Sequence, residues 1–413
     1  MVIFFALAAL AVLVTANWYL WRRLFRDTTS RAGWARRTGA AVVAGGWVLA
    51  VGALVAERAG APFWLQRVLA WPGFLWLALS IYLLLGVLAG EAVRPLLRRH
   101  LERRDRRAAP AGIAVPQPET VPAGAPPEEP PPAAAPEPGP SRRLFVSRVV
   151  AGAAATAAVG TVGYGTYGVL RGPRVKRVTV PLARLPRAAH GYRIAVVSDI
   201  HLGPVLGRGF AQTVVDTINS TQPDLIAVVG DLVDGSVKDL GPAAAPLAGL
   251  KARDGAFFVT GNHEYFSGAE EWVRQVRRLG IDPLENERTE LPYFDLAGVN
   301  DIAGESYGQG PDFARALGDR DTTRACVLLA HQPVQIHDAV EHRVDLQLSG
   351  HTHGGQLWPG NLLASAANPT LAGLDRYGDT QLYVSRGAGA WGPPTRVGAP
   401  SDVTVIELAS KQA

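Results

Sequence analysis

Five short polar segments contain most of the residues that could carry out chemistry, and each directly follows a run of apolar residues. They combine aspartate, histidine and asparagine without a thiol, a donor set that suits Mn, Fe or Zn better than Ca or a soft metal. The segments are Asp199-Ile200-His201, Gly230-Asp231-Leu232-Val233-Asp234, Gly261-Asn262-His263-Glu264, His331 alone, and Gly350-His351-Thr352-His353.

This set of side chains matches the needs of phosphoryl transfer. Two divalent ions about 3.5–4 Å apart can hold both the attacking and the leaving oxygen of a phosphoryl displacement. Such a pair needs one anionic bridging ligand, for which an aspartate has two oxygens, and imidazoles, a carboxylate and an amide can complete the shell. Each segment alone is weak or moderate evidence, but all five at predicted strand ends indicate a two-metal phosphoesterase site.

The elements that position these segments form an α/β pattern from about residue 190 onward. Side chains at the carboxyl ends of strands meet in the crevice above an α/β sheet. Two amphipathic helices are expected, at Arg208–Ser220 and Ala269–Leu279. The expected strands are Tyr192–Ser198, Asp224–Gly230, Ala256–Thr260, Cys326–Ala330, Leu346–Ser349, Leu382–Ser385 and Val403–Leu408.

With these motifs the chain resembles the calcineurin-like metallophosphoesterases, specifically their membrane-attached bacterial branch with a twin-arginine-like leader. The resemblance covers roughly Tyr192–Leu408 and includes His353-Gly354-Gly355-Gln356 and Tyr383-Val384-Ser385-Arg386-Gly387. It implies a four-layer α/β/β/α sandwich that binds two divalent metal ions. In this family a metal-activated hydroxide attacks a phosphomonoester, phosphodiester or pyrophosphate.

The resemblance also implies a role for eight side chains. His263 is the histidine that binds no metal, contacts the phosphate and protonates the leaving group. The implied metal ligands are Asp199, His201 and His353 for the first ion, Asp231 as the bridge, and Asn262, His331 and His351 for the second ion.

Three further residues are predicted to lie near the site. Asp234 either orients a metal ligand or caps a turn. Glu264 is expected to hold a histidine, because metal-bound imidazoles usually donate to a carboxylate. Arg386 either contacts the substrate phosphate or forms a surface ion pair.

The amino-terminal region contains stretches long enough to cross a bilayer, which requires about 20 apolar residues. Residues 1–107 are expected to form three transmembrane helices. Residues 141–171 form either a fourth span or a twin-arginine-like signal, which Ser141-Arg142-Arg143-Leu144-Phe145-Val146 resembles. The uncharged stretches are Met1–Trp21, Thr38–Ala56, Val68–Gly90 and Val149–Leu170, and the last is alternatively a Gly/Ala-rich linker.

Arginine clusters predict the orientation. Six arginines lie in residues 22–37 and seven in residues 94–107, and such loops stay in the cytoplasm. Residues 108–140 contain 12 prolines and are expected to be a disordered cytoplasmic linker. The catalytic domain, residues 190–413, is therefore expected outside the cytoplasm, on a bacterial inner or plasma membrane.

Charge and cysteine content limit the partners. Residues 1–148 hold 18 Lys/Arg against 9 Asp/Glu, a net of +9, and residues 149–413 hold 23 against 27, a net of −4. The basic excess thus accompanies the apolar stretches, so nucleic acid is not an expected partner. Expected partners are the membrane and a phosphate-ester substrate that could be lipid- or envelope-linked. Cys326 is the only cysteine, which excludes an internal disulfide and suggests a buried, inert thiol.

Two other functions are compatible with the same residues. If the catalytic domain is cytoplasmic, a UDP-diacylglucosamine-type pyrophosphate hydrolase becomes the leading enzyme alternative. A non-catalytic sensor that binds a ligand through its metals is the second. A transporter is a weaker interpretation, because the apolar stretches contain no ionisable residue that would mark a transport path.

Overall fold

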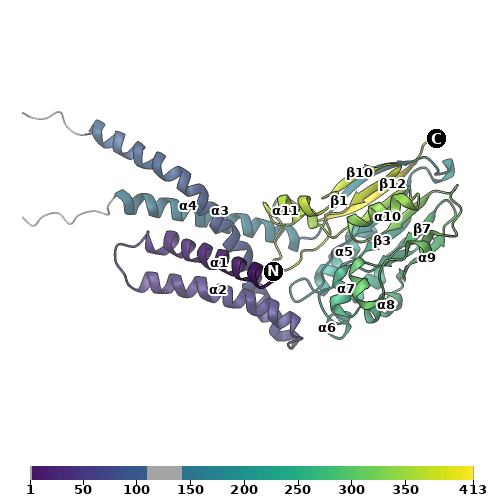
Figure 1. The fold of residues 1–413 in the computed structure, drawn as a ribbon, viewed down its shortest axis with the longest axis horizontal. Coiled ribbons are helices and arrows are strands. Elements are labelled where there is room, and N and C mark those ends of the chain that lie inside the picture. Colours follow the sequence, from purple (N-terminus) through teal and green to yellow (C-terminus); the bar gives the residue numbers. More distant parts are fainter. Residues whose placement is uncertain (1, 109–141, 413) are drawn as a thin grey trace, which may run out of the picture. The chain divides into compact units, whose positions relative to one another are not determined.

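The computed structural model describes residues 2–108 and 142–412. The chain divides into two units, and helices run from one into the other. The first unit comprises residues 1–45 and 80–159, and the second comprises residues 46–79 and 160–413. Figure 1 shows long helices in the amino-terminal part of the chain and a mixed α/β arrangement in the rest.

Three helices in the described part of the chain are long and apolar enough to cross a membrane. They are α2 (Trp34–Arg58), α3 (Phe63–Ala108, in which residues 63–104 qualify) and α4 (Arg142–Leu170). They contain the last three of the four predicted spans. The first predicted span coincides with helix α1 (Val2–Trp21), but several of its side chains lie outside the described residues, as does almost all of the predicted linker 108–140.

Helix α3 is longer than its predicted span, Val68–Gly90, because it continues through the arginine cluster to Ala108. Arginine, leucine and glutamate are good helix formers, so the added charge does not end the helix. In the first unit, Gly86 and Gly90 of α3 lie against Ala154 and Val150 of α4. Small residues allow such close helix packing, which is common in membrane helices.

The second unit contains two six-stranded mixed sheets. In the first sheet, β1 pairs parallel with β12, β12 pairs antiparallel with β2, and β2 to β5 are parallel. In the second sheet, β11, β9, β8 and β7 are parallel, with β10 and β6 antiparallel at the two edges. The strands of the first sheet, in spatial order, are β1 (Arg174–Leu182), β12 (Asp402–Ser410), β2 (Tyr192–Val197), β3 (Leu225–Val229), β4 (Ala256–Val259) and β5 (Asp282–Pro283). The strands of the second sheet, in spatial order, are β10 (Gly373–Tyr377), β11 (Thr380–Val384), β9 (Leu346–Ser349), β8 (Cys326–Leu329), β7 (Asp295–Gly298) and β6 (Glu287–Glu290).

Successive side chains of a strand point to opposite faces of its sheet, so each strand contributes residues to two different hydrophobic cores. Ile194 and Val196 of β2 belong to a buried cluster that contains residues of both sheets, including Phe294 and Val327. Ala195 and Val197 point the other way, into a cluster with helices α5 (Arg208–Ser220), α6 (Val237–Ala244) and α8 (Ala269–Arg278). The opposite face of the second sheet packs on α9 (Phe313–Leu317) and α10 (Ile336–Glu341).

Most predicted strands and both predicted helices are present near their expected bounds, and β9 and α5 have the expected bounds. Strand β1, however, begins at Arg174, ahead of the expected domain boundary at residue 190. It pairs with β12 along nine residues. Its three basic residues and its proline, Pro181, are typical of an edge strand.

The parallel strands place the polar segments together. Strands β2, β3 and β4 of the first sheet end immediately before Asp199, Asp231 and Asn262, separated only by one or two residues. Strands β8 and β9 of the second sheet end in the same way before His331 and His351. One edge of the paired sheets therefore collects all five segments.

Candidate metal centre

The backbone of the polar loops is strained at five of the predicted ligands. These residues have φ angles of 48–70°, a left-handed region that non-glycine residues rarely adopt, although Asp and His enter it more readily than most. Strain of this kind costs of order 1–3 kcal/mol per residue and is concentrated at functional sites. The five residues are Asp199, His201, Asp231, His351 and His353.

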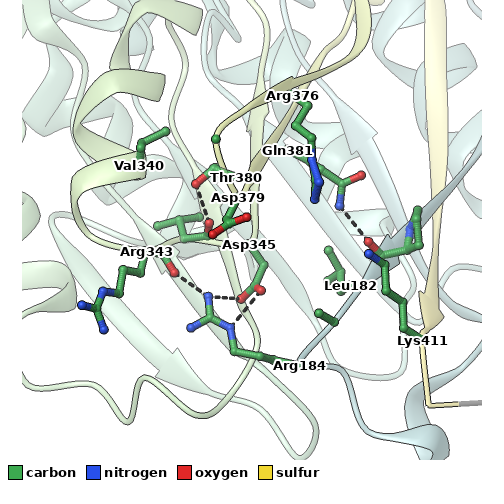
Figure 2. Close-up of a pocket in the computed structure, with 14 residues that line it drawn as sticks. Leu182, Arg184, Val340, Arg343, Asp345, Arg376, Asp379, Thr380, Gln381 and Lys411 are labelled. Atoms are coloured by element: carbon green, nitrogen blue, oxygen red, sulfur yellow. Dashed lines mark hydrogen bonds and ion pairs between the residues drawn. The ribbon is translucent and has the colours of Figure 1, made fainter.

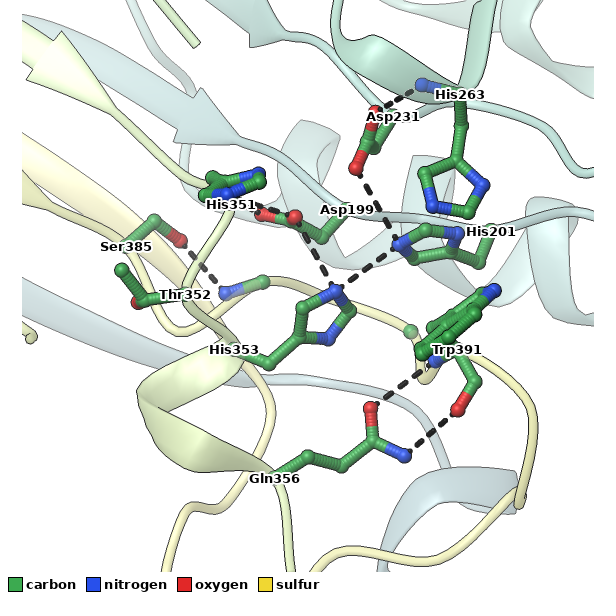
Figure 3. A network of polar contacts seen from close by, with 12 residues as sticks. Asp199, His201, Asp231, His263, His351, Thr352, His353, Gln356, Ser385 and Trp391 are labelled. Atoms are coloured by element: carbon green, nitrogen blue, oxygen red, sulfur yellow. Dashed lines mark hydrogen bonds and ion pairs between the residues drawn. The ribbon is translucent and has the colours of Figure 1, made fainter. Parts of the chain in front are cut away.

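The first group of ligand atoms comes from Asp199, His201 and His353, and its members all lie within 4.8 Å of one another. The Nε2 atoms of His201 and His353 face each other at 3.0 Å, and His353 Nε2 lies 3.4 Å from Asp199 Oδ1 (Figure 3). Asp199 is fully buried and accepts the backbone N–H of His351. Loops of both sheets thus converge on one point.

A second group consists of Asp231, His331 and His351, again with ligand atoms within 4.8 Å. Asp231 Oδ2 lies 3.2 Å from His331 Nε2 and 3.8 Å from His201 Nε2, so it stands between the two groups. The side-chain oxygen of Asn262, at the start of α7 (Asn262–Ser267), lies 3.0 Å from His351 Nδ1. The structure therefore brings all seven predicted ligands together.

The pKa values of the histidines divide into two kinds: His351 and His353 are held in the neutral form that a cation needs, whereas neighbouring aspartates outweigh burial and raise the pKa of His201 and His331. His331 Nδ1 lies 2.9 Å from the carbonyl oxygen of Val229, whereas its buried Nε2 has no hydrogen-bond partner. Burial, together with the charge of His331, lowers the pKa of His351 to about 4. Burial and the neighbouring His201 hold the pKa of His353 well below its usual value. Neutral imidazoles are the form that binds metals.

Asp231 is an anion suited to a position between cations. Burial alone would raise the pKa of this carboxyl, but the charges of His331, His263 and His201 hold it well below its usual range. The other oxygen, Oδ1, accepts the backbone N–H of His263 at 2.9 Å. A buried carboxylate with one oxygen facing an unpartnered imidazole nitrogen fits the donor set of a metal centre.

Asp234 connects the metal ligands to His263. Its Oδ1 lies 2.8 Å from His201 Nδ1 and 2.7 Å from His263 Nδ1. Burial opposes protonation of His263, but Asp234 outweighs it and raises the pKa of this histidine to about 9. The first of the two predicted roles, orientation of a ligand, describes this contact, and Ser236 rather than Asp234 caps α6.

The prediction that Glu264 holds a histidine is wrong. This buried carboxylate accepts the backbone N–H groups of Asp231, Leu232 and Gly261, at 3.0, 2.8 and 2.6 Å. The loops after β3 and β4 turn toward each other and present these amides, which no strand partner satisfies. Glu264 therefore fixes the shape of both loops instead of orienting an imidazole.

Arg396 is a further residue of the centre that sequence reasoning did not identify. It is buried and donates to the carbonyl oxygens of His353 and Gly389, at 2.9 and 2.7 Å, with its Nη2 3.2 Å from His353 Nδ1. It is the only charged residue in segment 387–400, which is the signal that could have identified it. Arg386, by contrast, lies half-buried with its stem against Gly354.

Another polar cavity, of about 840 Å³, opens at the opposite end of the sheets (Figure 2). It is lined by the end of β1 and by the residues that begin β9 and β11. Arg184 there is ion-paired with Asp345 at 3.0 Å and donates to the carbonyl oxygens of Thr322 and Arg343. Since protein acceptors already engage this guanidinium, Arg184 is held in place by the fold and is not free to bind a phosphate.

Comparison with known proteins identifies the family. The model of the calcineurin-like phosphoesterases matches residues 192–355. A "Transmembrane protein with metallophosphoesterase domain" from Danio rerio is 40% identical over 265 residues, 60% of each chain. "Uncharacterized metallophosphoesterase" proteins from Helicobacter pylori and Aquifex aeolicus are 37% and 35% identical, over 66% and 58% of this chain and 74% and 92% of theirs.

The matched region thus covers 60% of the length of the zebrafish relative. The relatives come from a vertebrate as well as from bacteria, so they do not assign the chain to a bacterial branch. They share the domain that contains the grouped histidines and aspartates. The chain belongs to the calcineurin-like metallophosphoesterase family.

Proposed function

We propose that this protein is a membrane-anchored, metal-dependent phosphoesterase with a dinuclear centre. The observation that carries the proposal is that two of the three groups of ligand atoms within 4.8 Å contain the predicted ligands, with Asp231 of the second group close to His201 of the first; the third group joins His201 to Asp234 and His263. Asp199, His201 and His353 would hold one ion, Asn262, His331 and His351 the other, and Asp231 both. The cores on both faces of the two sheets support the four-layer α/β/β/α sandwich.

When bound, divalent ions of the Mn, Fe or Zn type polarise the phosphate and supply a water nucleophile at neutral pH. The chain positions the other participants. Asp234 fixes His263 through Nδ1, which leaves Nε2 free to donate a proton to the leaving oxygen. Because Asp234 also contacts His201, it fixes the position of the proposed proton donor relative to a predicted metal ligand.

The helices supply the anchor. The three apolar helices and the transmembrane relatives indicate membrane association. The arginine clusters at 22–37 and 94–107 favour a cytoplasmic location for residues 108–140 and an extracytoplasmic catalytic domain. Protease added to right-side-out membrane vesicles should then digest the catalytic domain and spare the linker. Protection of the domain would reverse this orientation.

Metal loading of the full-length protein tests the catalytic proposal. The purified chain is stripped with a chelator, reloaded with Mn, Fe or Zn, and assayed for bound metal and for hydrolysis of mono-, di- and pyrophosphate esters. Two ions per chain and metal-dependent turnover are expected. His331→Ala should lose bound metal and turnover. His337→Ala, on the exposed face of α10, should keep two ions and full turnover. Metal binding without turnover of any ester class would instead support a ligand sensor.

A further inference from the structure

Helix α11 (Gly360–Ala367) exposes an apolar surface beside the metal centre. The helix contains no charged residue and buries none of its side chains. Leu362 and Leu363 are 64% and 78% exposed. Adjacent large apolar side chains that are exposed on an uncharged helix are typical of a surface that contacts a protein or a membrane. Helix α11 follows His353–Gly355 by only a few residues, so its surface adjoins a predicted ligand.

Two further exposed apolar residues, both aromatic, lie next to the proposed acid His263. Trp391 and Phe266 are 44% and 65% exposed, and their ring centres lie 5.7 and 5.6 Å from that of His263. The backbone of Trp391 is bonded on both sides to the side chain of Gln356 (Figure 3). We call Leu362, Leu363, Trp391 and Phe266 the apolar rim.

The apolar helix α4 ends next to the loop at residues 395–397, which follows Trp391 of the rim in sequence. The hydroxyls of Thr166 and Thr395 lie 2.7 Å apart, and Arg396 donates its backbone N–H to Gly165 at 3.4 Å. The next residue, Val397, donates to Gln356 at 2.8 Å. The loop that begins α11 is therefore only two hydrogen bonds away from the last turns of α4.

The last turns of α4 also show where the bilayer surface lies. Tyr164 and Tyr167 are among the exposed aromatic residues, and Arg171 follows the end of the helix. Tyrosine and tryptophan collect at the interface between lipid tails and water, and arginine lies just beyond it. Residues 395–397, which contact α4 and bond to Gln356, therefore lie near the level expected for the lipid headgroups.

A second contact within the same unit places the membrane on the same side. Val205, in the loop after His201, packs against Ala53 of α2 and Ala70 and Phe74 of α3. Both helices are apolar enough to span a membrane. Two separate contacts, one with α4 and one with α2 and α3, therefore join apolar helices to loops at the edge of the sheets that carries the metal centre, and neither contact involves the opposite edge.

We propose that the apolar rim is embedded in the headgroup layer of the bilayer that holds these helices, so that the metal centre opens onto the lipid surface. The occupant of this surface is lipid. The rim itself contains no charge that would favour water or a polar protein partner. This inference goes beyond the proposed hydrolysis. It does not depend on hydrolysis, because insertion of the rim into lipid requires neither bound metal nor turnover.

The test measures lipid contact directly in the full-length chain. Leu363→Cys is labelled with a fluorophore and reconstituted in nanodiscs of phosphatidylethanolamine and phosphatidylglycerol that contain a spin-labelled quencher lipid. The native Cys326 is buried and burial raises its pKa to about 12, so it does not compete for the label. Lys251→Cys, exposed ahead of β4 at the other end of the sheet, is the matched control.

Quenching at Leu363 is expected to be several-fold stronger than at Lys251. Leu362→Cys should behave like Leu363→Cys, which guards against an effect of one label. Equal quenching at the two ends of the sheet would overturn the proposal, and so would intermolecular energy transfer between Leu363 labels, which would identify a second copy as the occupant. Metal-stripped protein should give the same result, so a failure of the proposed hydrolysis is distinguishable.

Discussion

The two ends of the paired sheets hold their buried charges in opposite ways. At the cavity end, Asp345 accepts Arg184 Nε at 3.0 Å and the backbone N–H of Cys326 at 2.7 Å, so its carboxylate is satisfied within the protein. At the metal end, buried His331 Nε2 faces Asp231 Oδ2 at 3.2 Å and has no hydrogen-bond partner. Only the second arrangement leaves an atom that needs something else.

The number of strained backbone conformations also differs between the two ends of the sheets. The five predicted ligands with left-handed φ angles all lie at the metal end, and Glu264 fixes the shape of the loops after β3 and β4 through backbone amides. The cavity end is not free of these features, since Arg343 also has a left-handed φ and the neighbouring Arg320 has an unpartnered Nη1, but only the metal end collects five strained residues around one point. A paired, relaxed charge such as Arg184 with Asp345 only stabilises the fold.

The largest expected difference is between aspartates at the two ends. Asp231→Asn removes the charge that both groups of ligand atoms share, so hydrolysis should fall to background and bound metal below two ions per chain. Asp345→Asn should keep metal and turnover but lose about 1–3 kcal/mol of unfolding free energy, as expected for a disrupted buried hydrogen bond. Metal analysis, an ester assay and denaturant unfolding measure this. Two ions in Asp231→Asn would contradict the assignment.

His263→Ala should separate chemistry from metal binding. Removal of a general acid typically costs about 10²–10⁴-fold in rate, and both metals should remain bound. The loss should shrink for nitrophenyl esters, whose leaving group hardly needs a proton. His351→Ala should lose metal and activity together for every leaving group. If His263→Ala binds a single ion per chain, this histidine is a ligand.

Asp234→Asn should have a smaller effect than His263→Ala. The amide can still contact one histidine but cannot stabilise both, and loss of such a partner typically costs about 10–100-fold in metal affinity or activity. Asp254→Asn is the matched control, because Asp254 also accepts two donors, Tyr192 and Arg253, ahead of β4. Titration of metal into stripped protein measures the affinity, and equal affinities in the two variants would refute the role of Asp234.

The smallest expected effect concerns strain alone. In metal-free protein, His351→Gly should be more stable than His351→Ala by about 1 kcal/mol, since glycine adopts the left-handed φ of 70° without a Cβ clash. At His331, where φ is not left-handed, alanine should be the more stable of the same pair. Denaturant unfolding of the four variants measures both differences. The same sign at both positions would show that backbone strain is not the cause.

Sequence alone predicted the parts of this site that depend on local pattern. The buried strands read as short apolar runs that end at a polar segment, so the positions of Asp199 or His351 could be inferred from strand ends. Strand β1 was missed because it is an edge strand rich in basic residues whose partner, β12, is distant in sequence. Arg396 was missed because its contact with His353 depends on the path of a loop without regular structure.

The position of β12 has a consequence for how the protein is made. This strand lies between β1 and β2, although it is the last strand in the chain. Neither neighbour can complete its ladder before residues 402–410 have left the ribosome. The apolar helices α2, α3 and α4 precede β12 by more than 200 residues in the chain, so β1 stays unpaired long after these helices have been synthesised. We therefore expect the first sheet to close only after β12 has been synthesised.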